Sequence, residues 1–166
     1  MVRPYTPAVS RAPSGLLDDD AREFFTGPVS AILGTADRLN TPDATRVVGI
    51  APITDSRARI LISSEAREAH ANAALGARAS VLVTDITNYR SLQWKGRVVQ
   101  AYQPRTPGDL ALMHRHIDAF RAAAPTIGVS LRVVDGLFPN DVGAIEVEFD
   151  AKFDQTPGAG AGHRIV

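Results

Sequence analysis

The stretch from Arg46 to Val98, RVVGIAPITDSRARILISSEAREAHANAALGARASVLVTDITNYRSLQWKGRV, decides the fold. It reads as strand, turn, strand, short helix, strand, loop and strand, because short apolar runs alternate with polar turns. Apolar strands around one short helix can close most of a small barrel, which removes free sheet edges. The second strand leads directly into a helix that opens with Ser63 and Ser64, and such a strand-to-helix corner can hold an anion.

The flanking sequence adds further strands and two helices. A helix over Leu16 to Phe25 is expected after a Ser14 cap, and Thr106, Pro107 and Asp109 are typical of the start of a longer helix that ends at Pro125. The pattern therefore predicts an α+β, mainly β protein: an antiparallel barrel of six to seven strands with short flanking helices. The expected strands cover residues 29–36, 45–53, 59–63, 79–84, 91–101, 128–134 and 143–150, and the short helix covers 65–75 with Ser64 as its cap.

The chain length favours one domain. Residues 1–15, rich in Pro, Ser and Ala, are expected to form a flexible arm, residues 16–150 the barrel domain, and residues 151–166 a flexible Gly-rich tail. We find no internal repeat.

Composition excludes several classes of protein. Lys plus Arg and Asp plus Glu both number 18, and this zero net charge argues against a nucleic-acid partner. The absence of cysteine excludes disulfides, thiolate metal sites and cysteine catalysis. No apolar run approaches the length of a membrane span, and the N-terminal stretch lacks the apolar core of a signal peptide. We expect a cytoplasmic protein without a membrane partner.

The histidines give no metal site. His114 and His116 are two apart on a predicted helix and point about 200° apart, so they cannot chelate one ion together. We expect His70, on the short helix, to be a solvated residue and not a ligand. Nucleophile elbow, Walker and dinucleotide glycine motifs are missing as well, so we assign no catalytic residue.

The Ser63 corner remains as the candidate site. Ser63, Ser64, the amides of the following helix and Arg67 could surround one phosphate, with Arg46 on the neighbouring strand as a second cation. The alternative is that Ser64 only caps the helix and the arginines are surface residues. The next long strand places Ser91, Gln93 and Lys95 on one face, which either meets solvent or lines a site, and puts Trp94 on the core face.

The order of these elements, with the segment GARASVLVTD and the strand Arg90-Ser-Leu-Gln-Trp-Lys-Gly96, resembles the pyridoxamine 5′-phosphate oxidase-like family of FMN-binding split β-barrels. The resemblance covers residues 16 to 149. It implies a homodimer that holds FMN in clefts between its subunits and acts on a small-molecule substrate. The residues that it assigns to the cofactor are Arg46, Val47, Ile62, Ser63, Ser64, Arg67, Ser91, Gln93 and Lys95.

The sequence departs from the family pattern at Ala51, Glu68, Ala69 and Ser91, where the family has Lys, Arg, Lys and Gln. Replacing two of these cations by Ala and the third by an acid should weaken phosphate binding, since each charge-assisted contact contributes ~1.5–3 kcal/mol. The C-terminal substrate residues of the vitamin B6 oxidase have no match, so the sequence indicates a divergent relative. Three functions stay open: an FMN-dependent oxidoreductase, a non-catalytic binder of flavin, deazaflavin or haem, and a dimeric domain without a cofactor.

Overall fold

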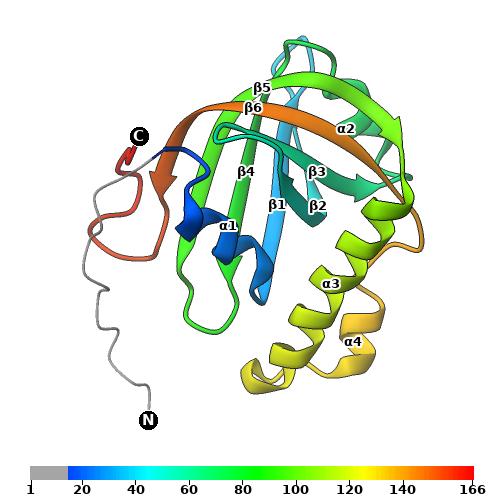
Figure 1. Ribbon diagram of the computed structural model, residues 1–166, viewed down its shortest axis with the longest axis vertical. Helices are drawn as coiled ribbons and strands as arrows, with labels where there is room; N and C mark the ends of the chain where they lie inside the picture. Colours follow the sequence, from blue (N-terminus) through cyan, green and yellow to red (C-terminus); the bar gives the residue numbers. More distant parts are fainter. Residues whose placement is uncertain (1–14) are drawn as a thin grey trace.

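The computed structural model describes residues 15–166, and its six strands close into one antiparallel barrel in the order β1-β2-β3-β6-β5-β4 (Figure 1). The ends of this order also pair, since β1 and β4 are hydrogen-bonded to each other. Every strand thus has two partners and the barrel has no free edge. The elements are α1 (Asp19–Thr26), β1 (Val29–Ala36), β2 (Pro42–Pro52), β3 (Arg57–Ser63), α2 (Arg67–Asn72), β4 (Arg78–Asp85), β5 (Ser91–Pro104), α3 (Pro107–Ala123), η1 (Ala124–Ile127), α4 (Leu131–Asp135) and β6 (Val142–Asp154).

The barrel is filled from alternate positions of its strands. On β1, for example, Ala31 and Leu33 are fully buried while their neighbours are only half-buried. Trp94 is fully buried in the same core, as predicted from its position on the apolar face of the strand. Its ring centre lies 5.0 Å from that of Phe25, in an edge-to-face arrangement. The predicted fold class is therefore confirmed, with six strands.

Helix α1 packs against this core, but its start differs from the prediction. Asp18 is the cap, because its Oδ1 accepts the Ala21 N–H at 2.9 Å. The expected cap, Ser14, lies outside the described residues. The apolar face of α1, with Ala21, Phe24 and Phe25, is buried.

The strand predicted over residues 128–134 is wrong. Gly128 adopts a left-handed conformation with φ of +78° and ends η1, and Ser130 then caps α4 by accepting the Val133 N–H. The apolar residues that suggested a strand serve a helical turn instead, because Val134 packs with Phe120 of α3 in a small separate cluster. The helix expected over 65–75 is also shorter, and Ser64 does not cap it.

Helix α3 lies against the outside of the barrel, over β2, β3 and β6 (Figure 1). The predicted start is confirmed, since Thr106 and Asp109 form a reciprocal capping box. The carboxylate of Asp109 also accepts two bonds from the Arg59 guanidinium of β3, both at 2.8 Å. This pair is mostly buried, with 18% and 5% of the two side chains exposed, and it holds the N-terminal end of α3 on the barrel.

The C-terminal residues turn back onto the end of β6 (Figure 1). Phe153 and Arg164 form a bridge, the Ile165 N–H donates to the Lys152 carbonyl at 2.7 Å, and Ile165 packs against the core. Strand β6 itself runs to Asp154, so the expected domain boundary at residue 150 falls inside a strand. Whether the tail is flexible stays a prediction.

None of the helices within residues 15–166 combines the length and the apolar character needed to cross a membrane.

We expect Asp109→Asn to lower the free energy of unfolding by roughly 2 kcal/mol, because it weakens the two charge-assisted bonds to Arg59 and leaves that guanidinium only the more distant carboxylate of Glu146, at 3.6 Å. The Arg59 hydrogen bonds hold the pKa of Asp109 at about 2, below its ordinary value of 3.8. The folded state thus gains stability above pH 4 that is lost as the pH falls towards 2, by roughly 2 kcal/mol. Urea unfolding at several pH values measures both effects. Asp150→Asn, which breaks the exposed pair with Arg78, is the control and should cost under ~1 kcal/mol. An equal loss in both variants would contradict the assignment.

Candidate functional site

The corner between β3 and α2 brings together part of the predicted site. Strands β2 and β3 are antiparallel and pair Val47 with Ile62. Arg46, which precedes Val47, therefore lies beside Ser63, which follows Ile62. Arg67 is the first residue of α2 and is exposed. The side chains of Val47 and Ile62 are fully buried in the barrel core, so only their backbone could meet a ligand outside it.

The hydrogen-bond donors of this corner are already engaged. The Glu65 N–H donates to Ser63 Oγ at 3.1 Å, and the N–H groups of Ala66 and Arg67 donate to carbonyls of the same turn. The Ser64 N–H donates to the carbonyl of Asp141, with Ser64 Oγ 3.4 Å from the same oxygen. The start of α2 therefore offers an anion few free amides, unlike the open helix terminus that the sequence suggested.

Arg46 is different, because its guanidinium has no carboxylate partner among residues 15–166. The side chain is half-buried, with its guanidinium carbon 6.0 Å from the centre of the Phe138 ring. Residues 1–14 contain no acidic residue either. A partly buried cation without a counter-charge favours binding of an anion there.

The β5 half of the predicted site lies on the other side of the barrel. Ser91, Gln93 and Lys95 share one face, as predicted, but β5 is three strands from β2 in either direction around the barrel. The residues that follow β6 contact this face: the Gln155 side chain donates to Gln93 Oε1 at 3.1 Å. The ammonium group of Lys95 lies 4.8 Å from the centre of the Phe153 ring.

Ser91 is buried within this half and has its own partners. Its Oγ lies 2.9 Å from Thr84 Oγ1, and its N–H donates to Thr156 Oγ1 at 3.0 Å. The side chain is therefore satisfied inside the protein. The contacts of residues 153–156 with β5 could not be predicted from the sequence. The Gly-rich composition of the tail predicts a flexible segment and does not indicate its partners.

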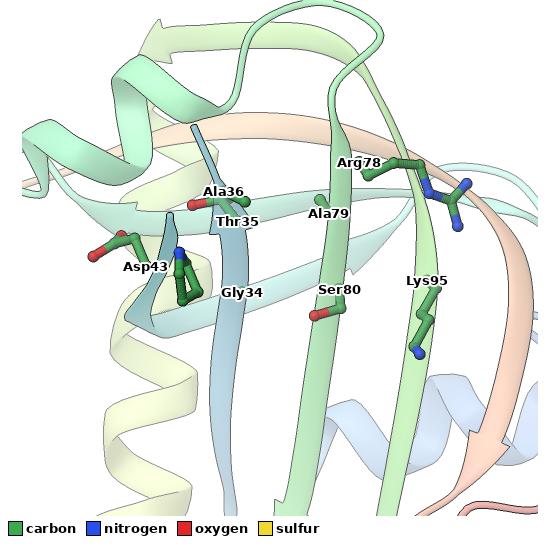
Figure 2. A pocket seen from close by; sticks show the side chains of 9 residues that line it. Gly34, Thr35, Ala36, Asp43, Arg78, Ala79, Ser80 and Lys95 are labelled. Carbon is green, nitrogen blue, oxygen red and sulfur yellow. The ribbon is translucent and has the colours of Figure 1, made fainter. Parts of the chain in front are cut away.

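Lys95 also lines a cavity of about 330 Å³ at the ends of β1 and β4 (Figure 2). In Figure 2, Arg78 and Lys95 come from adjacent strands, with Asp43 and Thr35 on the far side of Ser80. Arg78 is neutralised by Asp150, so Lys95 is the cation of this cavity that lacks a carboxylate partner within the described residues. The cavity is also lined by Gly34, Ala36, Pro42 and Ala79.

The structure locates two of the residues at which the sequence differs from the family pattern, Ala51 and Glu68. Ala51, at the far end of β2 from the corner, borders a second cavity, and Glu68 adds a negative charge to the first turn of α2. Within residues 15–166, no group of three His, Cys, Asp or Glu side chains gathers as a metal site. The positive charge of Arg46 suits the phosphate of FMN, but the corner has few free hydrogen-bond donors. The corner therefore offers the phosphate one strong contact, from Arg46.

His116 is a residue of this region to which the sequence gave no function. It is 7% exposed and packs edge-on against Phe138, with ring centres 6.0 Å apart. Burial, together with the charge of Arg46, lowers its pKa from 6.5 to about 4, so the ring is neutral at pH 7. The helical spacing could have predicted its burial, since position 116 falls between Met113 and Phe120 on the buried face of α3.

The topology, with a short helix between β3 and β4 and a long one between β5 and β6, defines a split-barrel protein. No protein-family model and no curated protein matches the sequence. Solved structures match its fold. HupZ of Group A Streptococcus has a TM-score of 0.55 and 11% identity, over 89% of this chain and 100% of that one. An F420 reductase has a TM-score of 0.52 and 19% identity, over 84% and 97%.

A putative pyridoxamine 5′-phosphate oxidase from Lactobacillus delbrueckii has a TM-score of 0.50 and 12% identity, over 82% of this chain and 93% of that one. These likenesses confirm the fold expected from the resemblance to pyridoxamine 5′-phosphate oxidase-like proteins. The low identities agree with a divergent sequence.

The buried His116 predicts a stability loss in mild acid. The unfolded chain binds a proton at this residue near pH 6.5, whereas the folded chain binds it only near 4. The free energy of unfolding should therefore fall by roughly 3 kcal/mol as the pH drops from 6.5 to 4. His116→Phe should abolish this dependence, measured by denaturant unfolding, and the exposed His114→Phe should keep it. The same slope in all three proteins would contradict the prediction.

Proposed function

We propose that the protein binds a flavin-type cofactor in clefts between two copies of the chain and acts as an oxidoreductase. It would pass electrons between a reduced nicotinamide or a small organic substrate and an acceptor. The observation that carries the proposal is Arg46, a half-buried cation without a carboxylate partner in residues 15–166, beside Ser63 at the end of β3. The fold supports it, since one matching structure is an F420 reductase and another a putative pyridoxamine 5′-phosphate oxidase.

The chain's own part in this function is binding and orientation. A bound flavin supplies the redox chemistry itself, so the protein needs no nucleophile or acid–base pair of its own. Arg46 would hold the anionic end of the cofactor, with Arg67 adding positive charge from α2. Lys95 and Gln93 would present a cation and an amide to the ring, and a cation there favours the reduced form.

The proposed dimer follows from the separation of these groups. Arg46 on β2 and Gln93 on β5 lie on opposite sides of one barrel, so one flat cofactor cannot contact both in the same chain. A second copy could supply the missing half. The outer face between them carries the adjacent apolar residues Ile32 and Leu82, which are only half-buried in one chain. Such a face suits a subunit contact.

The second candidate function is binding without turnover of a flavin, a deazaflavin or haem on the same dimeric barrel. The engaged donors at the Ser63 corner favour it, because they leave a phosphate fewer contacts than a tight FMN site would give. A haem carries no phosphate and does not need them.

The visible absorption spectrum of the purified protein, before and after addition of FMN and desalting, tests the proposal. Retained flavin bands are expected, followed by bleaching with NADH or NADPH. Flavin that stays bound without being reduced would favour the second candidate. A featureless spectrum would contradict flavin binding and direct the search to haem, deazaflavin or no cofactor.

Arg46→Ala should weaken FMN binding by roughly tenfold or more, because it removes a charge-assisted contact. Fluorescence titration of flavin into the protein measures the affinity. Arg132→Ala, an exposed arginine of α4, is the matched control and should bind like the unchanged protein. Equal affinities in both variants would contradict the role of Arg46.

Leu82→Asp should convert the dimer into a monomer, since it places a charge in the proposed contact face. Sedimentation velocity gives the mass of the particle. Gln100→Asp, at an exposed position of β5, should remain dimeric. A monomeric unchanged protein would contradict the proposed dimer.

A further inference from the structure

A second cavity of about 280 Å³ lies between the C-terminal end of α1, the end of β2 and the middle of α3. Its walls are mainly apolar, with Phe25 from α1 and Leu112 from α3 facing the end of β2. Ala51 has a side chain of only one carbon, which leaves the space open. The remaining lining residues are Thr26, Ile50, Pro52, Arg115 and His116.

His116 gives this cavity a polar group that has no hydrogen-bond partner within the described residues. The side chain is more than nine-tenths buried, yet neither ring nitrogen has a hydrogen bond to any residue of 15–166. Every fully buried side-chain nitrogen or oxygen in that part of the chain has a partner. The ring nitrogens of His116 must therefore reach accessible space, and the cavity is the space that this residue lines.

The electrostatics of the cavity favour an anion. Arg115 lines it from an exposed position and has no carboxylate partner within the described residues, and the positive charge of Arg46 acts on the His116 ring. Asp109, the acidic residue in the first turn of α3, already pairs with Arg59. A neutral imidazole can donate one hydrogen bond, and a guanidinium can form a charge-assisted bond with a carboxylate.

We propose that this cavity binds a small carboxylic acid with an apolar body, such as an aromatic monocarboxylate. The ring or branched chain lies against Ile50 and Leu112, and the carboxylate contacts Arg115 and the His116 ring. The volume is at the lower end for ligand pockets, which restricts the body to one ring or a short chain. The site lies at the far end of β2 from the Ser63 corner, so the inference does not depend on flavin binding.

Titration of the full chain with benzoate, phenylacetate and 3-methylbutanoate tests the proposal, with calorimetry for affinity and ¹H–¹⁵N spectra for location. We expect saturable binding of at least one acid, with shifts centred on Ile50, Leu112 and His116. Benzamide, which has the same ring but no charge, should bind at least tenfold more weakly. No saturable binding of any of these acids to the folded protein would overturn the proposal.

Three variants locate the site. Arg115→Gln should weaken acid binding by roughly three- to tenfold, because it removes a charge-assisted bond made by an exposed side chain. Ala51→Leu should abolish it by filling the cavity, and His116→Phe should weaken it while keeping a ring in place. The matched controls are His114→Phe and Arg132→Gln, which change exposed residues outside the cavity.

Circular dichroism and a thermal unfolding curve establish that each variant is folded before its affinity is interpreted. Folded Arg115→Gln and Ala51→Leu proteins that bind the acid as tightly as the unchanged chain would also overturn the proposal. FMN retention is measured in the same variants to distinguish this site from the cofactor site. If the protein does not bind FMN, the expected binding of the acids is unchanged.

Discussion

The ion pair between Arg59 and Asp109 fixes the position of α3, and the candidate sites depend on that position. Its two bonds of 2.8 Å join the first turn of α3 to the middle of β3, in a place that water barely reaches. Once the helix is held there, Met113 can bury itself against Val48 and Leu61 on the outside of the barrel. His116, one turn further along, then faces the end of β2 and shares the electrostatic field of Arg46.

The placement of α3 changes what the outer surface of β2 can bind. Without the helix, Arg46 would be a solvated surface cation with little preference for any anion. Beside α3 and Phe138, it is partly removed from water while remaining without an acid, so its charge acts over a lower dielectric. Burial beneath the helix, with the charge of Arg46 as the smaller contribution, lowers the pKa of His116 and keeps its ring neutral at pH 7. One helix therefore helps to create both a cation suited to an anionic cofactor and a mainly apolar cavity, lined by His116, a few residues away.

The C-terminal segment has a comparable effect on the opposite side of the barrel. Phe153 at the end of β6 contacts Lys95, and Gln155 just after it bonds to Gln93, so both polar side chains of β5 are partly covered. A cofactor that approaches Gln93 has to meet this segment as well. The tail is therefore part of the surface that any ligand of β5 would contact.

The sequence by itself determined the barrel, the core position of Trp94 and the start of α3, because these depend on local periodicity and on capping chemistry within a few residues. It also placed Arg46 and Ser63 on neighbouring strands. It misassigned residues 128–134, since an apolar run of that length suits a strand and a buried helical turn equally well.

Only the tertiary structure decided how the polar groups are used. The Asp141 carbonyl that occupies Ser64 is 77 residues away in the chain, and the segment that covers Gln93 is 62 residues away. The cavity at His116 is formed by three elements whose contact follows from packing. No local pattern encodes such long-range partners, because hydrogen bonds and cavities depend on the position of every wall at once.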